Sequence, residues 1–141
     1  MTTVDFYNLA SSDPSSLLEF TARLALKAWR SGHNVYIHCD DMTQVSDIRD
    51  SLYTVEPSSL PAVSSCDDKN IAPIHIGFDD EHAPRATSDV MINAASSLAL
   101  CFSRFVRLLE ITNQQEDIRN IKRQNYKFYR ERSYQIKSHN I

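Results

Sequence analysis

Apolar and polar residues alternate with a period that switches between that of a strand and that of a helix. The segment 4–9, VDFYNL, alternates residue by residue and predicts a first strand. The next apolar residues recur on one helical face, at Leu17, Leu18, Leu24, Ala25, Ala28 and Trp29. Asp13 and Pro14 are placed to cap and open this helix, and Gly32 is expected to end it.

The same alternation continues along the chain. Strands are predicted at 34–39, 72–78, 89–93 and 106–112, the last of them the final strand. A second helix is expected after the DD pair, with Val45, Ile48 and Leu52 buried, and 96–105 is helical or mixed. The last helix is predicted to start near Asn113, with Glu116 as its capping-box partner. Segments 54–70 and 79–88 are predicted to be surface loops.

Strands that alternate with helices favour an α/β fold. We expect one domain spanning 1–141, a three-layer α/β/α sandwich with a mostly parallel, Rossmann-like sheet and a C-terminal basic helix. Such folds bind ligands at the carboxyl ends of their strands.

The glycine content argues against a nucleotide site at these strand ends. The chain holds two glycines, Gly32 and Gly77, and neither GxxxxGK[ST] nor GxGxxG is present. Phosphate-cradling loops use several glycines because backbone N–H groups must converge on the anion. No cofactor is therefore expected.

Cysteine usage and the N-terminal pattern bear on the compartment. Three scattered cysteines, Cys39, Cys66 and Cys101, fit a reduced cytoplasmic protein better than a disulfide scaffold. The N-terminal residues show no export signal, and VMINAASSLALCF is too short and too polar to cross a bilayer.

Two polar stretches raise the question of catalysis. HCDD, at 38–41, and DDEHAPR, at 79–85, gather histidine, thiol and carboxylate groups. A metal-dependent hydrolase using them is the least favoured alternative, because adjacent residues point in different directions and neither EF-hand nor HExxH spacing occurs. We expect helix-capping aspartates and a solvated loop, with no catalytic residue and no metal ligand.

The charge distribution singles out the C-terminal end. Residues 119–141 carry seven Lys or Arg against one Glu, a net charge of +6, whereas the preceding residues carry −9. At about 100° per residue, several side chains of this end fall within one third of a helix: Arg119, Arg123, Tyr126, Lys127 and Arg130. A second face, with Ile118, Ile121, Phe128 and Tyr129, is predicted to pack on the sheet.

This basic stripe admits several interpretations. A solvated helix face is one. Among ligands, a nucleic acid would use the cations for phosphates and the ring for stacking. A membrane would need a larger apolar face. An acidic peptide with an apolar end would use an arginine for its carboxylate and a notch beside the tyrosine.

Four segments resemble one known family, the chi subunit of bacterial DNA polymerase III. They are VDFYNL, KAWRSGHNVYIHCDD, DVMINAASSLALCFSRFVRLLEI and RQNYKFYRERSYQI, in the order of that family. The resemblance implies a non-catalytic adaptor in DNA replication that joins two partners. One is the psi subunit of the clamp loader, and the other is the acidic C-terminal tail of single-stranded DNA-binding protein, which ends in phenylalanine.

The resemblance also carries site residues onto this sequence. It places the tail at Arg123, Tyr126 and Lys127 with Arg119 beside them, and Arg130 and Thr112 at the rim, so that DNA is engaged only indirectly. The psi contact corresponds to Tyr53, Leu60 and Pro61, where the match is looser. A protein that binds nucleic acid directly through the same basic helix remains the main alternative.

Overall fold

The computed structural model describes residues 1–85 and 88–141, and within them the chain forms one seven-stranded parallel sheet, three α-helices and two short 3-10 helices. The strands are β1 (Thr3–Asn8), β2 (Val35–His38), β3 (Val63–Ser65), β4 (Ile74–Gly77), β5 (Ser88–Asn93), β6 (Phe105–Thr112) and β7 (Ile136–Asn140). The helices are α1 (Pro14–Arg30), α2 (Met42–Val55), η1 (Asp80–His82), η2 (Leu100–Arg104) and α3 (Glu116–Glu131).

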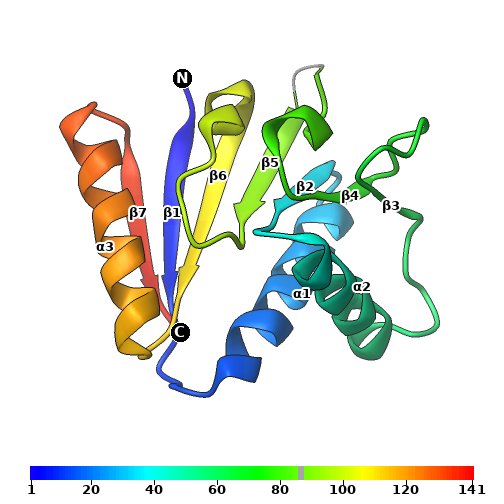
Figure 1. Cartoon of the computed structure of the whole chain (residues 1–141), viewed down its shortest axis with the longest axis horizontal. Coiled ribbons are helices and arrows are strands. Elements are labelled where there is room, and N and C mark those ends of the chain that lie inside the picture. The colour runs from blue at the N-terminus through cyan, green and yellow to red at the C-terminus, as the bar shows by residue number, and fades with distance from the viewer. Residues whose placement is uncertain (86–87) are drawn as a thin grey trace.

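The strand order, β3-β4-β2-β5-β6-β1-β7, explains where the helices lie. Connections between parallel strands are right-handed, so the direction of travel along the sheet decides which face a helix covers. The chain travels one way from β1 through α1 to β2 and on through α2, but the opposite way from β6 through α3 to β7. Figure 1 accordingly shows α3 beside β1 and β7, apart from α1 and α2.

Each face of the sheet has its own core. On one face, α1 and α2 pack on Val35, Ile37, Ile76 and other inward residues of the central strands. On the other face, Tyr129 of α3 and residues of η2 join a cluster rich in aromatic rings: Val4, Phe6, Tyr36, Ala83, Met91, Ala99, Cys101, Phe102, Phe105, Leu108 and Tyr129. The expected three-layer α/β/α architecture is confirmed, with every described strand parallel.

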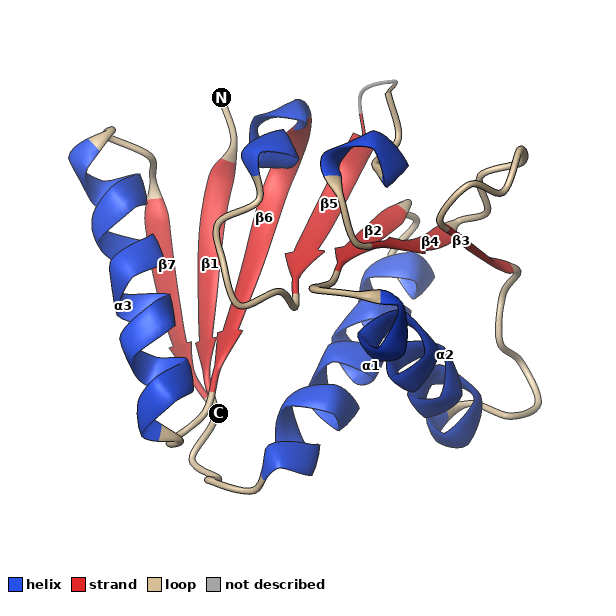
Figure 2. Ribbon diagram, in the orientation of Figure 1, coloured by secondary structure: helices blue, strands red, loops and turns tan. Residues whose placement is uncertain are grey.

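Several predicted details are also confirmed. The Asp13 carboxylate accepts a hydrogen bond from Ser15 N–H, and Asp41 caps α2 by accepting from Gln44 N–H. Gly32 adopts a φ of +92° just beyond α1, where a residue without Cβ is favoured. Figure 2 shows α1 and α2 in blue beneath β2, β4 and β3. Within the described ranges, no helix is long and apolar enough to cross a membrane.

Other expectations were wrong. The loop predicted at 54–70 contains β3, and the loop predicted at 79–88 contains η1, although Ala86 and Thr87 of that segment lie outside the described residues. The strand ending at Thr112 is not the last, because β7 follows α3 and pairs with β1. Both missed strands are short edge strands of polar sequence, VSS and IKSHN, which show no apolar alternation.

Substitution of either glycine should lower the free energy of unfolding, but for different reasons. A Cβ on Gly77, at the end of β4, would collide with the Cβ of His82 and lie 3.0 Å from the Tyr36 hydroxyl. We expect Gly77→Ala to lower the free energy of unfolding by about 1–3 kcal/mol, because η1 must move. Gly32 has open space around it, so Gly32→Ala should cost only its backbone strain, about 1–2 kcal/mol.

Urea unfolding of both variants measures these costs. Retention of wild-type stability by Gly77→Ala would show that η1 does not press on the end of β4.

Candidate functional site

Helix α3 begins three residues later than the sequence suggested. The predicted start near Asn113 was wrong, because the Asn113 side chain instead accepts from Gln115 N–H and donates to the Gln115 side chain. Gln115 is the N-cap residue without a side-chain capping bond. Glu116 and Asp117 occupy the first turn, where negative charge complements the helix dipole.

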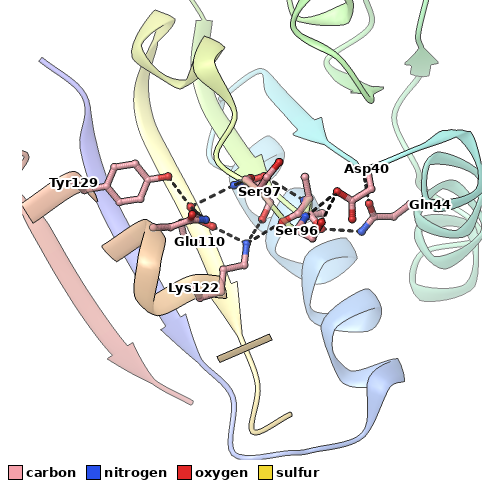
Figure 3. A network of polar contacts seen from close by, with 11 residues as sticks. Asp40, Gln44, Ser96, Ser97, Glu110, Lys122 and Tyr129 are labelled. Atoms are coloured by element: carbon pink, nitrogen blue, oxygen red, sulfur yellow. Dashed lines mark hydrogen bonds and ion pairs between the residues drawn. The ribbon is translucent and has the colours of Figure 1, made fainter. Parts of the chain in front are cut away.

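The inward face of α3 is held by one buried acid. Glu110 on β6 is fully buried, and its carboxylate accepts from Lys122 Nζ at 2.7 Å, the Tyr129 hydroxyl at 2.6 Å and Asn125 Nδ2 at 3.1 Å. Asn93 Nδ2 on β5 lies 3.3 Å from the same carboxylate. Figure 3 shows Tyr129 and Lys122 converging on Glu110. We call these five residues the Glu110 cluster.

The Glu110 cluster is satisfied as a unit. Lys122 Nζ also donates to the carbonyl oxygens of Asn93, at 3.1 Å, and Ala95, at 3.3 Å, so its ammonium has three acceptors. Burial raises the pKa of Tyr129 well above its ordinary range, and the Glu110 carboxylate adds to that effect. The phenol therefore stays protonated and donates to Glu110. Pairing and hydrogen bonding of this kind offset the free-energy cost of burying a charged carboxylate.

These contacts correct the predicted packing face of α3. Tyr129 is fully buried as expected, but Ile118, Ile121 and Phe128 are only half-buried. Lys122 and Asn125 take the central inward positions instead. The sequence did not indicate that these two residues are buried, because both are polar. The spacing of 122, 125 and 129 nevertheless places all three on one helical face, opposite an acid on the preceding strand.

The outward face of α3 borders a groove of about 440 Å³. Its walls come from α3, from the ends of β6 and β1, and from β7: Phe6, Asn8, Thr112, Asn113, Gln114, Arg119, Lys122, Arg123, Tyr126, Ser138 and Asn140. The Tyr126 ring packs edge-on against Phe6, with centroids 5.3 Å apart, yet remains 37% exposed. The groove thus has one aromatic wall that is both anchored and accessible.

The groove is electropositive. No Asp or Glu is among its lining residues, and Arg119 and Arg123 make no ion pair with any described residue. Lys122 reaches the lining too, but Glu110 neutralises it. Two free guanidinium groups beside an exposed ring suit an anion with an apolar neighbour, since arginine binds carboxylates and phosphates through paired N–H donors.

The predicted tail-binding residues do not all reach this groove. Arg119, Arg123, Tyr126 and Thr112 line it together. Lys127 and Arg130 are exposed outside its lining, and Lys127 Nζ lies 3.9 Å from Glu131. Asn8 at the end of β1, together with Ser138 and Asn140, forms a polar wall, and the last two were not predicted to lie there because β7 was not predicted.

The predicted psi-contact residues lie on a different surface. Tyr53 is 53% exposed on α2, and Leu60 and Pro61 are half-buried in the segment that leads to β3. Leu60 packs against the core beneath α1 and α2. Figure 1 shows that α2 and β3 lie at the end of the sheet away from α3.

The two polar stretches behave mainly as structural caps. Asp41 caps α2, Asp79 accepts from Glu81 and His82 N–H in η1, and Asp40 accepts from Ser96. His38 and Cys39 are both buried but belong to opposite faces of the sheet. Adjacent residues thus point apart, as the sequence argument required.

The fold and the groove define a parallel α/β protein with a basic helix beside an open groove. A family model described as "DNA polymerase III chi subunit, HolC" matches residues 1–137, and the chain belongs to this family. The DNA polymerase III subunit chi of Pseudomonas aeruginosa is 33% identical over 141 residues, which cover 100% of this chain and 98% of that protein. Members of the family are non-catalytic accessory subunits of DNA polymerase III.

More distant relatives agree. Subunit chi of Escherichia coli is 22% identical over 118 residues, covering 82% of this chain and 80% of that protein. Subunit chi of Haemophilus influenzae is 22% identical over 141 residues, covering 99% and 97%. The resemblance stated from four segments of the sequence is therefore confirmed over nearly the whole chain.

The Glu110 cluster yields a stability prediction. Lys122→Met removes one partner and leaves the buried carboxylate without its counter-charge, so the free energy of unfolding should fall by about 3–5 kcal/mol. Adding Glu110→Gln removes the charge itself and should recover much of that loss. Urea unfolding of both single variants and the double variant gives the coupling energy. Additive losses, with no recovery in the double variant, would contradict the pairing.

Proposed function

We propose that this protein is a cytoplasmic adaptor that docks the acidic C-terminal tail of single-stranded DNA-binding protein in the groove beside α3, and contacts the psi subunit of the clamp loader through the surface around Tyr53, Leu60 and Pro61. Membership of the chi family supports a place in the DNA polymerase III holoenzyme. The observation that carries the tail proposal is the convergence of Arg119, Arg123 and Tyr126 on one groove without an acidic neighbour.

Each part of the tail has a counterpart in the groove or beside it. Arg123 binds the terminal carboxylate through its paired N–H donors. The phenyl ring of the last residue enters the notch formed by Tyr126 and Phe6, where an edge-on aromatic pair already exists. Arg119 and, further along the helix, Arg130 attract the aspartates that precede the terminal residue. Ser138 and Asn140 lie across the groove, where they can bond the backbone of the peptide.

The magnitudes support binding of moderate strength. One charge-assisted hydrogen bond contributes about 1.5–3 kcal/mol, and burial of one aromatic ring contributes a similar amount. Association itself costs several kcal/mol in lost freedom of motion. A few such contacts therefore give an affinity on the order of 1 μM, which salt should weaken because the cations are exposed.

The adaptor role requires two separate docking surfaces. The groove lies at the β1–β7 end of the sheet, and the proposed psi surface lies at the α2–β3 end. Both partners can thus bind at once without competing for the same residues. Direct binding of nucleic acid would instead need a row of free cations, and here Lys122 is neutralised by Glu110 and Lys127 lies near Glu131.

Arg123→Ala tests the docking of the carboxylate. We expect the affinity for a tail peptide to fall about 10-fold to 100-fold, because one charge-assisted bond is lost. Arg132→Ala is the matched control, since it removes the same charge but Arg132 stacks on Phe128, 3.6 Å from the ring centroid, outside the groove. Titration calorimetry measures both. Equal affinities for Arg123→Ala and wild type would refute the proposal, as would oligonucleotide binding without any peptide binding.

Two substitutions of Tyr126 test the contribution of its aromatic ring separately from that of its hydroxyl group. The Tyr126 hydroxyl has no hydrogen bond to the described residues, so Tyr126→Phe should keep the peptide affinity within about twofold. Tyr126→Ala removes the wall and should weaken binding about 10-fold, the cost of one aromatic contact. Calorimetry, with circular dichroism as a check of folding, decides the matter. A loss in Tyr126→Phe as large as in Tyr126→Ala would show that the ring is not the wall.

A further inference from the structure

Three side chains from distant segments meet on the α3 face of the sheet but away from the groove. His38 ends β2, Asp80 opens η1 and Cys101 belongs to η2. One donor atom from each lies within 4.8 Å of the other two. Two of these residues come from the polar stretches at 38–41 and 79–85, which bring no such set together by themselves. None of the three lines the groove beside α3.

Hydrogen bonds on one side of the ring assign the tautomer of His38. Its Nδ1 lies 3.0 Å from the Tyr36 hydroxyl, and that hydroxyl lies 3.3 Å from the carbonyl oxygen of Asp79. A carbonyl oxygen only accepts, so the hydroxyl donates to it and accepts from His38 Nδ1–H. Nε2 then carries the lone pair. A fixed hydrogen bond on the far ring nitrogen is the usual outer contact of a metal-binding histidine.

Burial favours the neutral forms of His38 and Cys101. His38 is 7% exposed and Cys101 is 3% exposed, and burial lowers the pKa of His38, which keeps the imidazole neutral. One carboxylate oxygen of Asp80 accepts from the backbone N–H of Cys101 at 3.3 Å, which fixes the acid beside the thiol. Burial and the Asp80 carboxylate raise the pKa of the Cys101 thiol to about 12, so the thiol is protonated without a metal.

We propose that His38, Asp80 and Cys101 bind a zinc ion as three protein ligands, with water in the fourth position. Zinc accepts imidazole nitrogen, thiolate sulfur and carboxylate oxygen in a tetrahedral arrangement. One thiolate and one carboxylate balance its two positive charges, so the buried site is neutral. The Cys101 proton leaves to solvent as the Zn–S bond forms, and no other bond changes.

The geometry requires only a small adjustment. With zinc–ligand distances of about 2.0–2.3 Å, tetrahedral ligand atoms lie roughly 3.5 Å apart. The three donor atoms, which lie within 4.8 Å of one another, would therefore close in by up to about 1.3 Å. The ion would link the end of β2 to η1 and η2, two short segments that cover this face of the sheet. It would stabilise the fold by binding only the native state, and it requires no catalytic role.

Cobalt titration tests the site directly. Reduced, chelator-treated protein titrated with Co²⁺ should develop visible bands of tetrahedral cobalt and a near-ultraviolet thiolate-to-cobalt band, saturating at one equivalent and displaced by Zn²⁺. Cys101→Ser should lose the thiolate band and bind at least 10-fold more weakly. Cys66→Ser is the matched control, because it removes a thiol outside the cluster and should leave both signals unchanged.

Further measurements keep the result unambiguous. Asp80→Asn preserves the side-chain shape and should also weaken Co²⁺ binding at least 10-fold, and Zn²⁺ should raise the melting temperature of wild type but not of Cys101→Ser. Affinity for the tail peptide should be the same in all variants, so failure here is distinct from failure of the groove. The proposal is overturned if wild type takes up no stoichiometric Co²⁺, or if the thiolate band survives in Cys101→Ser or disappears in Cys66→Ser.

Discussion

The buried carboxylate of Glu110 holds α3 in one rotation about its axis, and the lining of the groove depends on that rotation. Lys122, Asn125 and Tyr129 repeat on one helical face and all donate to this single acid. Rotating α3 would break all three of these bonds at once and leave a fully buried carboxylate unpaired, so the observed orientation is strongly favoured. Arg119, Arg123 and Tyr126 then turn outward by the geometry of the helix, and these three residues of the basic stripe line the groove.

The sheet supplies the other half of the arrangement. Right-handed connections send α3 to the opposite face from α1 and α2, and the return strand β7 pairs beside β1 at the sheet edge. Phe6, Ser138 and Asn140 thereby face α3 across the groove. The second surface that we propose, on α2 and the segment before β3, lies at the far end of the sheet. A single sheet can thus hold two partners apart, which suits an adaptor.

The sequence predicted what local rules govern and missed what distant segments decide. Asp13 and Asp41 predicted where helices start, and Gly32 predicted where one ends. Capping and a positive φ depend only on residues close by in the sequence. The helical period likewise brought Arg119, Arg123 and Tyr126 together. The helical period could not show that Lys122 turns inward, since that depends on an acid on another element. Nor could it show that Lys127 and Arg130 lie outside the groove, because the second wall of the groove is β7. The polar strands β3 and β7 carry no apolar pattern and owe their place to neighbouring strands.

We propose that the groove beside α3 binds the free carboxyl end of a peptide. Calorimetric titration of the wild-type protein with two tail peptides, identical except that one ends in a carboxylate and the other in an amide, tests it most directly. We expect amidation to weaken binding by about 10-fold or more, since it removes the charge that pairs with arginine. Equal affinity for the two peptides would contradict this proposal. The arginines would then bind only the acidic side chains of the peptide and not its terminal carboxylate.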